Sequence, residues 1–129
     1  MTLPLGEWSI NVSGRNLILN IVGISETGNL DRTSTLDGSP IQGFWDHRTQ
    51  KLVFSRPVPG APSQVFTGYH FIDGLEDPTD PSRTTLALSF DHTLAGSFQS
   101  VSGPPARILR GWFAKKTVTM AFDLLRKSG

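Results

Sequence analysis

Few side chains in this sequence are suited to catalysis or metal binding. The chain has three histidines, at positions 47, 70 and 92, and no cysteine. A thiolate nucleophile, a disulfide and a cysteine-based zinc site are therefore excluded. A metal site would need these histidines to meet Asp or Glu side chains from other strands. Four acids within residues 73–82 lack the Asp-x-Asp-x-Asp-Gly spacing of a calcium loop. We expect no metal ion and no cofactor.

The three histidines differ in their sequence surroundings. His70 lies in an apolar, β-prone segment, which predicts a hydrogen-bonded histidine near one end of a barrel. His47 and His92 each follow an aspartate, in Phe44-Trp45-Asp46-His47 and in Ser89-Phe90-Asp91-His92. An aspartate in a tight turn accepts a hydrogen bond from the backbone two residues on. Both pairs are thus predicted to form turns, with His47 and His92 facing solvent.

No arrangement of residues indicates an enzyme. The chain has neither a Gly-x-Ser-x-Gly elbow nor a glycine-rich phosphate loop that leads into a helix. The adjacent acids Glu76 and Asp77 lie in a polar segment, without the apolar surroundings that a general acid requires. We expect a protein that is not an enzyme, and the remaining interpretations are ligand binding and protein interaction.

The composition favours β-structure with many turns. The 13 Gly and 9 Pro are more than a soluble protein of 129 residues usually has. The helix formers Ala, Glu and Lys number 6, 3 and 4, against 25 Ser and Thr together. A helix bundle is excluded, and punctuation by Gly, Pro and Asp leaves the short segments that are typical of an antiparallel barrel or sandwich.

Alternation of apolar and polar residues locates the strands. Trp8, Ile10 and Val12 alternate with polar residues, and residues 64–72 are rich in aromatic and β-branched types. If Phe66 and His70 face inward, Tyr69 and Phe71 face outward. Turns are expected at 13–16 and 37–40, and loops at 57–62 and 73–82. The nine predicted strands are 6–13, 17–24, 30–36, 41–46, 51–56, 64–72, 84–90, 94–98 and 106–115.

The C-terminal residues fit two patterns. Val118, Met120 and Phe122 alternate as in a strand, but the same stretch also fits the helical period. Its good helix formers and basic last turn favour a short helix over 118–127. The predicted organisation is a barrel domain over 1–116 and a C-terminal tail over 117–129.

The charge distribution and the N-terminal residues bear on partners and location. Residues 1–106 carry 6 basic and 10 acidic side chains, whereas residues 107–129 carry 6 basic and 1 acidic. These basic residues are too widely spaced for a nucleic-acid or membrane surface. No apolar stretch approaches the roughly 18 residues of a membrane span, and a signal-peptide pattern is missing. We expect a cytoplasmic protein without nucleic-acid or membrane partners.

Several segments resemble the avidin and streptavidin family. They are Gly6-Glu7-Trp8, Gly28-Asn29-Leu30, the stretch Val65-Phe66-Thr67-Gly68 with Phe71-Ile72-Asp73 two positions later, and Arg110-Gly111-Trp112-Phe113. The resemblance implies an eight-stranded antiparallel up-and-down barrel, one strand fewer than our count, with a mouth for one small ligand. It also implies homodimers or homotetramers. A Gly-x-Trp start with a late arginine resembles the wider calycin group, which implies that Arg110 packs over Trp8 and closes the barrel.

The residues that hold biotin in that family are mostly replaced here. Ile10 occupies the position of the family's first-strand Asn, Ser34 that of a third-strand Tyr, and Leu86 that of a seventh-strand Trp. Phe66 is retained, and His70 occupies the position of a family cysteine. Since lost hydrogen-bond partners weaken binding of a polar head group, high-affinity biotin binding is not expected. The resemblance implies that a small, rather apolar molecule binds in a pocket lined by Ile10, Ser34, Trp45, Phe66, His70 and Leu86.

A second interpretation stays open. The 8 Phe and 3 Trp can fill the barrel and leave no room for a ligand. Tyr69 and Phe71, on the outer face, would then form an interface in an oligomerising structural or protein-interaction module.

Overall fold

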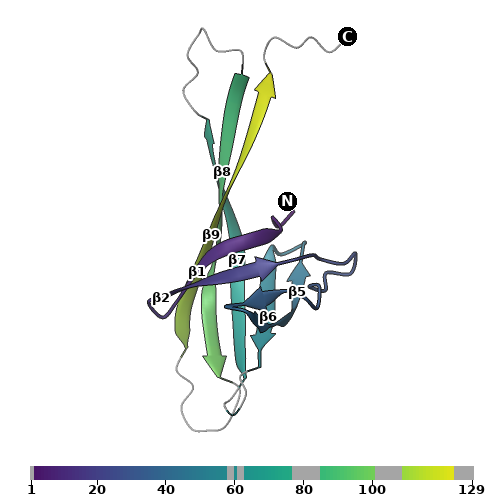
Figure 1. The fold of residues 1–129 in the computed structure, drawn as a ribbon, viewed down its shortest axis with the longest axis vertical. Helices are drawn as coiled ribbons and strands as arrows, with labels where there is room; N and C mark the ends of the chain where they lie inside the picture. The colour runs from purple at the N-terminus through teal and green to yellow at the C-terminus, as the bar shows by residue number, and fades with distance from the viewer. Residues whose placement is uncertain (1, 58–59, 61–62, 77–84, 101–108, 124–129) are drawn as a thin grey trace.

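The computed structural model describes residues 2–57, 60, 63–76, 85–100 and 109–123, with only the backbone for 74–76, 85–88 and 120–123. Throughout these ranges the chain is β-structure, turns and loops, without a helix. The strands form one antiparallel sheet that curls into a nearly closed barrel (Figure 1). They are β1 (Gly6–Val12), β2 (Arg15–Ile21), β3 (Thr35–Leu36), β4 (Ser39–Pro40), β5 (Gln42–Asp46), β6 (Lys51–Arg56), β7 (Gln64–Glu76), β8 (Thr85–Ser100) and β9 (Arg110–Asp123).

Two connections close the sheet. The strand order is β4-β3-β2-β1-β9-β8-β7-β6-β5, so the first and last long strands are neighbours. At the other join, the segment after β2 reaches β5: Leu30 N donates to Gly43 O at 3.0 Å and Trp45 N donates to Gly28 O at 2.7 Å. These bonds occupy groups that an open sheet edge would leave unpaired.

Two tight turns depend on left-handed backbone. Ser13 and Gly14 join β1 to β2 with φ angles of 49° and 86°, and Asp37 and Gly38 join β3 to β4 with 52° and 78°. Two successive positive φ angles are typical of the type I′ turn, whose twist matches that of the strands. The turns predicted at 13–16 and 37–40 are confirmed at 13–14 and 37–38, whereas residues 15–16 and 39–40 belong to β2 and β4.

Two predictions about the later strands are wrong. The helix predicted over 118–127 is a strand as far as Asp123, and residues 124–127 lie outside the described residues. The predicted turn at Asp91-His92 lies within β8, which runs from Thr85 to Ser100 without a break. In both places β8 and β9 pair continuously, and this pairing outweighs the weak local preference for a helix or a turn.

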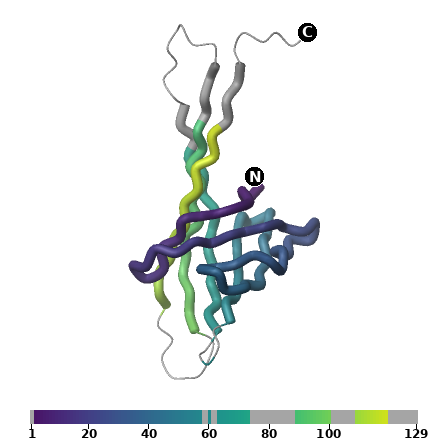
Figure 2. The backbone as a smooth tube through the Cα atoms, viewed as in Figure 1, coloured from purple at the N-terminus to yellow at the C-terminus, as the bar shows by residue number. Residues whose placement is uncertain are grey.

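The strands β7, β8 and β9 continue beyond the barrel as a three-stranded ribbon (Figures 1 and 2). The predicted loop over 73–82 is wrong at residues 73–76, which belong to β7, and residues 77–82 lie outside the described residues. The predicted boundary between 116 and 117 falls inside β9.

The core lies inside the barrel, where alternate residues along the strands face inward. Phe66 and His70 are buried, whereas Tyr69 and Phe71 are 47% and 56% exposed. The inward and outward faces predicted for residues 64–72 are confirmed at these four positions.

The pair implied by the calycin resemblance is not formed. Ser9 pairs with Lys115 and Val12 with Trp112, so the register carries Arg110 past the end of β1, away from Trp8. Lys116 lies near Trp8 instead, and its Nζ donates to Glu7 O at 3.0 Å. The predicted closing role of Arg110 over Trp8 is therefore wrong.

Candidate functional site

Five of the six predicted pocket residues are buried, and they are divided between different parts of the barrel. The exposed fractions are 1% for Ile10, 0% for Ser34, 5% for Trp45, 0% for Phe66 and 8% for His70. Side chains covered to this degree offer almost no surface to a ligand arriving from solvent.

The sixth residue, Leu86, is separated from the others along β8. Phe66 pairs with Phe98, whereas Leu86 pairs with Phe122 in the ribbon. At about 3.3 Å per residue, the strand carries Leu86 roughly 40 Å from Phe98. The side chain of Leu86 lies outside the described residues, and the register does not bring this position to Phe66.

Ser34 has a structural role in this arrangement. Its Oγ accepts a hydrogen bond from Val22 N at 3.1 Å, and its backbone bonds to Asp31 and Ile41. The hydroxyl thus satisfies a backbone donor where the chain leaves β2.

The first interior cluster, which we call the histidine cluster, consists of Trp8, Trp45, Gln50, His70 and His92. His70 Nε2 lies 2.9 Å from His92 Nδ1, and His70 Nδ1 lies 2.9 Å from Gln50 Oε1. Trp8 packs edge-on against both imidazoles, and Trp45 packs edge-on against His70. The prediction that His70 is a hydrogen-bonded histidine is confirmed.

The hydrogen bonds assign the protons of this pair. Gln50 Nε2 donates to His47 O at 2.9 Å, so the amide oxygen faces His70 and can only accept. His70 Nδ1 therefore carries a hydrogen, its Nε2 accepts, and His92 Nδ1 donates. Both rings are neutral in this arrangement.

Burial keeps both imidazoles uncharged. Desolvation, and then the neighbouring His92, lower the pKa of His70 to about 4. Desolvation also lowers the pKa of His92, against the opposing effect of Asp91. The two neutral rings share one hydrogen bond. The five residues of the cluster include no carboxylate that would orient either imidazole as a catalytic base.

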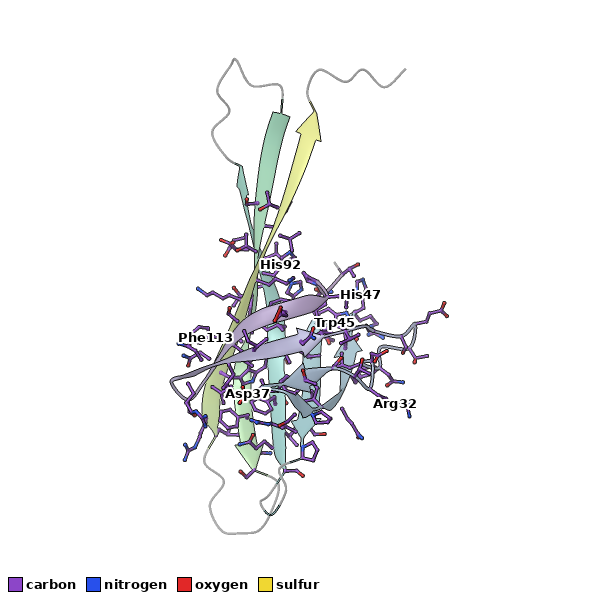
Figure 3. The ribbon with its side chains drawn as sticks, in the orientation of Figure 1. Arg32, Asp37, Trp45, His47, His92 and Phe113 are labelled. Atoms are coloured by element: carbon purple, nitrogen blue, oxygen red, sulfur yellow. The ribbon has the colours of Figure 1, made fainter. Side chains whose placement is uncertain are left out.

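The prediction that His92 faces solvent is wrong, since its exposed fraction is 6%. His47 is exposed, as predicted, and Arg48 N donates to Asp46 Oδ1 at 3.0 Å in the predicted turn. His47 and Trp45 lie on the same side of the barrel (Figure 3), beside a surface pocket of about 420 Å³.

The second interior cluster, which we call the aromatic plug, consists of Phe54, Phe66, Phe98 and Trp112. The Phe66 ring stacks between Phe54 and Phe98, with centroids 4.7 and 4.8 Å away. Trp112 packs edge-on against Phe54 and Phe66, and its Nε1 donates to Ser97 O at 3.0 Å. The four rings are each at most 6% exposed. Together they fill this level of the barrel.

The outward faces of β7, β8 and β9 carry a patch that we call the outer wall: Tyr69, Phe71, Thr93, Ala95 and Phe113. Tyr69 pairs with Ala95, Ala95 pairs with Phe113, and Phe71 pairs with Thr93. Phe113 is 45% exposed. Figure 3 shows Phe113 on the opposite side of the barrel from Trp45.

Six members of the two clusters were not among the predicted site residues: Trp8, Gln50, Phe54, His92, Phe98 and Trp112. Phe90, His92, Leu94 and Phe98 alternate across the supposed Asp-His turn, so the period of two along 90–98 was the available signal. For Trp112, the signal was its spacing of two from Ala114 in a β-prone segment.

No family model, curated protein or solved structure matches this chain. Among the described residues, no helix is long and apolar enough to cross a membrane. The same part of the chain holds no group of three or more His, Cys, Asp or Glu that could hold a metal ion.

Proposed function

We propose that the protein is a non-enzymatic interaction module of the cytoplasm that forms homo-oligomers through its outer wall. The observation that carries the proposal is the row Tyr69, Ala95, Phe113, in which two half-exposed aromatic side chains flank a small one across three paired strands. Aromatic residues are enriched in protein interfaces, and contiguous exposed apolar patches mark interaction sites.

The shape of the outer wall favours a second copy as the partner. Aromatic side chains project from β7 and β9, while β8 between them carries Ala95 and Thr93, so the surface has two ridges and a groove. A two-fold dimer uses the same patch on both subunits, and ridges beside a groove are complementary to their own copy. Lys115 and Asp91 at the margin supply both signs of charge.

We further propose that the barrel is avidin-like, with eight strands. Segment 28–34 bonds to β5 and continues into β3, and β4 and β5 are separated only by Ile41. Counting β4 and β5 as one strand gives eight. An eight-stranded barrel agrees with the avidin resemblance, and that resemblance implies a homodimer or homotetramer.

Native mass spectrometry and light scattering at micromolar concentration test the proposal. The wild-type chain is expected to be a dimer or tetramer, and Phe113→Lys a monomer. Phe44→Lys is the matched control, because Phe44 is an equally exposed phenylalanine, 46% against 45%, on β5. A monomeric wild type, or equal behaviour of the two variants, would contradict the proposal.

The second candidate function is the binding of a small, rather apolar molecule in the barrel. The observation that favours it is the histidine cluster, because His70 and His92 place polar groups inside an otherwise apolar interior. Such a ligand would have to displace buried side chains of the pocket. A small molecule that stays bound in the native mass spectrum, and is lost in His70→Phe, would support it.

A further inference from the structure

One mouth of the barrel holds a pocket that contains none of the six predicted site residues. It lies at the ends of β1, β2, β7, β8 and β9 and has a volume of about 350 Å³, at the lower end of ligand pockets in general. Its floor is the edge of the aromatic plug, at Phe98. Its lining is Val12, Ser13, Arg15, Gln64, Phe98, Gln99, Ser100 and Arg110.

The pocket is cationic. Arg15 and Arg110 come from β2 and β9, and no acidic side chain is among the lining residues. Arg110 lies two residues before the buried Trp112 of the same strand, so it projects to the inner face at the mouth. Two guanidinium groups that line one pocket, with no carboxylate among its described lining residues, favour the binding of an anion.

A buried polar group without a partner lies at the same mouth. The Oε1 atom of Gln64 is buried and has no hydrogen-bond partner among the described residues, and neither has Nε of Arg56. These two residues are register partners on β7 and β6. Arg56 does not line the pocket and the amide oxygen of Gln64 only accepts, so these two atoms do not themselves contact an anion there. Gln64 itself lines the pocket, and the donor that its side chain can offer to an anion is the Nε2 amide group.

We propose that this mouth binds a small oxyanion, the carboxylate or phosphate of a molecule of a few heavy atoms. Arg15 and Arg110 bind the anion from two sides, the amide of Gln64 donates a further hydrogen bond, and the Phe98 edge contacts the adjoining atoms. The inference is independent of the oligomer proposed above, because the outer wall and this mouth share no residue.

Calorimetric titration of the full chain tests the inference with three probes: benzoate, inorganic phosphate and the neutral benzamide. Benzoate or phosphate is expected to bind with millimolar or tighter affinity, weakening as salt is raised. The tighter of the two identifies a carboxylate or a phosphate as the group that the site takes. The proposal would be overturned if neither anion binds at ten times a millimolar concentration, or if benzamide binds as tightly as benzoate.

Matched variants then locate the site. Arg15→Gln and Arg110→Gln are each expected to weaken anion binding about tenfold, the effect of one lost charged hydrogen bond. Arg32→Gln makes the same change outside the pocket lining and should have no effect. All three arginines are exposed, so the variants should keep the wild-type melting temperature. Equal loss of binding in all three, or in none, would overturn the assignment to this mouth.

Discussion

At the scale of single residues, the two buried histidines couple stability to pH. The pKa of His70 is lowered to about 4 in the folded protein, whereas that of an unfolded histidine is near 6.5. The unfolded chain therefore binds the proton more tightly, and stability falls as the pH drops from about 6.5 towards 4. At pH values below this range, His70 lowers the free energy of unfolding by about 3 kcal/mol in total. His92 acts in the same direction.

Urea unfolding at pH 7, 5.5 and 4 measures this effect. His70→Gln keeps a hydrogen-bonding side chain but cannot titrate, so its stability should change less over the same range. Carboxylates titrate in both proteins, which is why the difference between the two curves is the relevant quantity. Parallel curves for wild type and variant would contradict the assignment.

The hydrogen bond between the imidazoles should also be visible in a deletion. His92→Ala removes the donor to His70 Nε2 and leaves that buried atom without its partner. We expect a loss of about 1–3 kcal/mol in the free energy of unfolding. His47→Ala, at an exposed turn position, should change it by less than about 0.5 kcal/mol. Equal losses in His92→Ala and His47→Ala would contradict the hydrogen bond between His70 and His92.

At the scale of elements, the close approach of β7, β8 and β9 depends on glycine. A Cβ built at Gly96 would collide with the backbone oxygen of Thr67, and one at Gly68 would lie 2.5 Å from Cζ2 of Trp112. Gly96→Ala must move a neighbouring strand of the ladder, so we expect a loss of about 2–3 kcal/mol in the free energy of unfolding.

Gly111 provides the control for this prediction. A Cβ at Gly111 meets nothing closer than 3.9 Å, although the residue lies in the neighbouring strand. Thermal and chemical unfolding of Gly111→Ala should therefore match the wild type within about 0.5 kcal/mol. A Gly96→Ala protein as stable as Gly111→Ala would show that β7 and β8 are not packed this closely.

The strands could be predicted from the sequence where one face is apolar and the ends are marked by turns. Residues 6–13, 41–46 and 51–56 were placed within about one residue of β1, β5 and β6. The helix expected over 118–127 and the turn at Asp91-His92 were wrong because long-range pairing decides both. A local pattern does not contain that pairing.

The candidate sites were less predictable than the strands. Residues facing inward along 64–72 follow from alternation, and so does the exposure of Tyr69 and Phe71. Which inward residues meet across the barrel depends on register, as the separation of Leu86 from Phe66 shows. The cationic mouth was missed for the same reason, since Arg15 and Arg110 are far apart in sequence.

At the scale of the whole molecule, buried side chains fill the described interior and an aromatic patch lies on the outside, which is why we propose a function for the outer wall. The aromatic plug occupies the space that a central ligand would need, while Tyr69, Phe71 and Phe113 remain half-exposed in one patch. Exposure of large aromatic side chains has a solvation cost in a monomer, which burial against a second copy removes.

The most direct test of this account is the rate at which a single thiol on the outer wall reacts with maleimide. The chain contains no cysteine, so Thr93→Cys places one thiol in the groove, and Thr27→Cys places one on a distant exposed loop. As the protein concentration is raised from nanomolar to tens of micromolar, labelling of Thr93→Cys should slow at least tenfold, while Thr27→Cys reacts at a constant rate. Equal, concentration-independent rates at the two positions would contradict self-association through the outer wall.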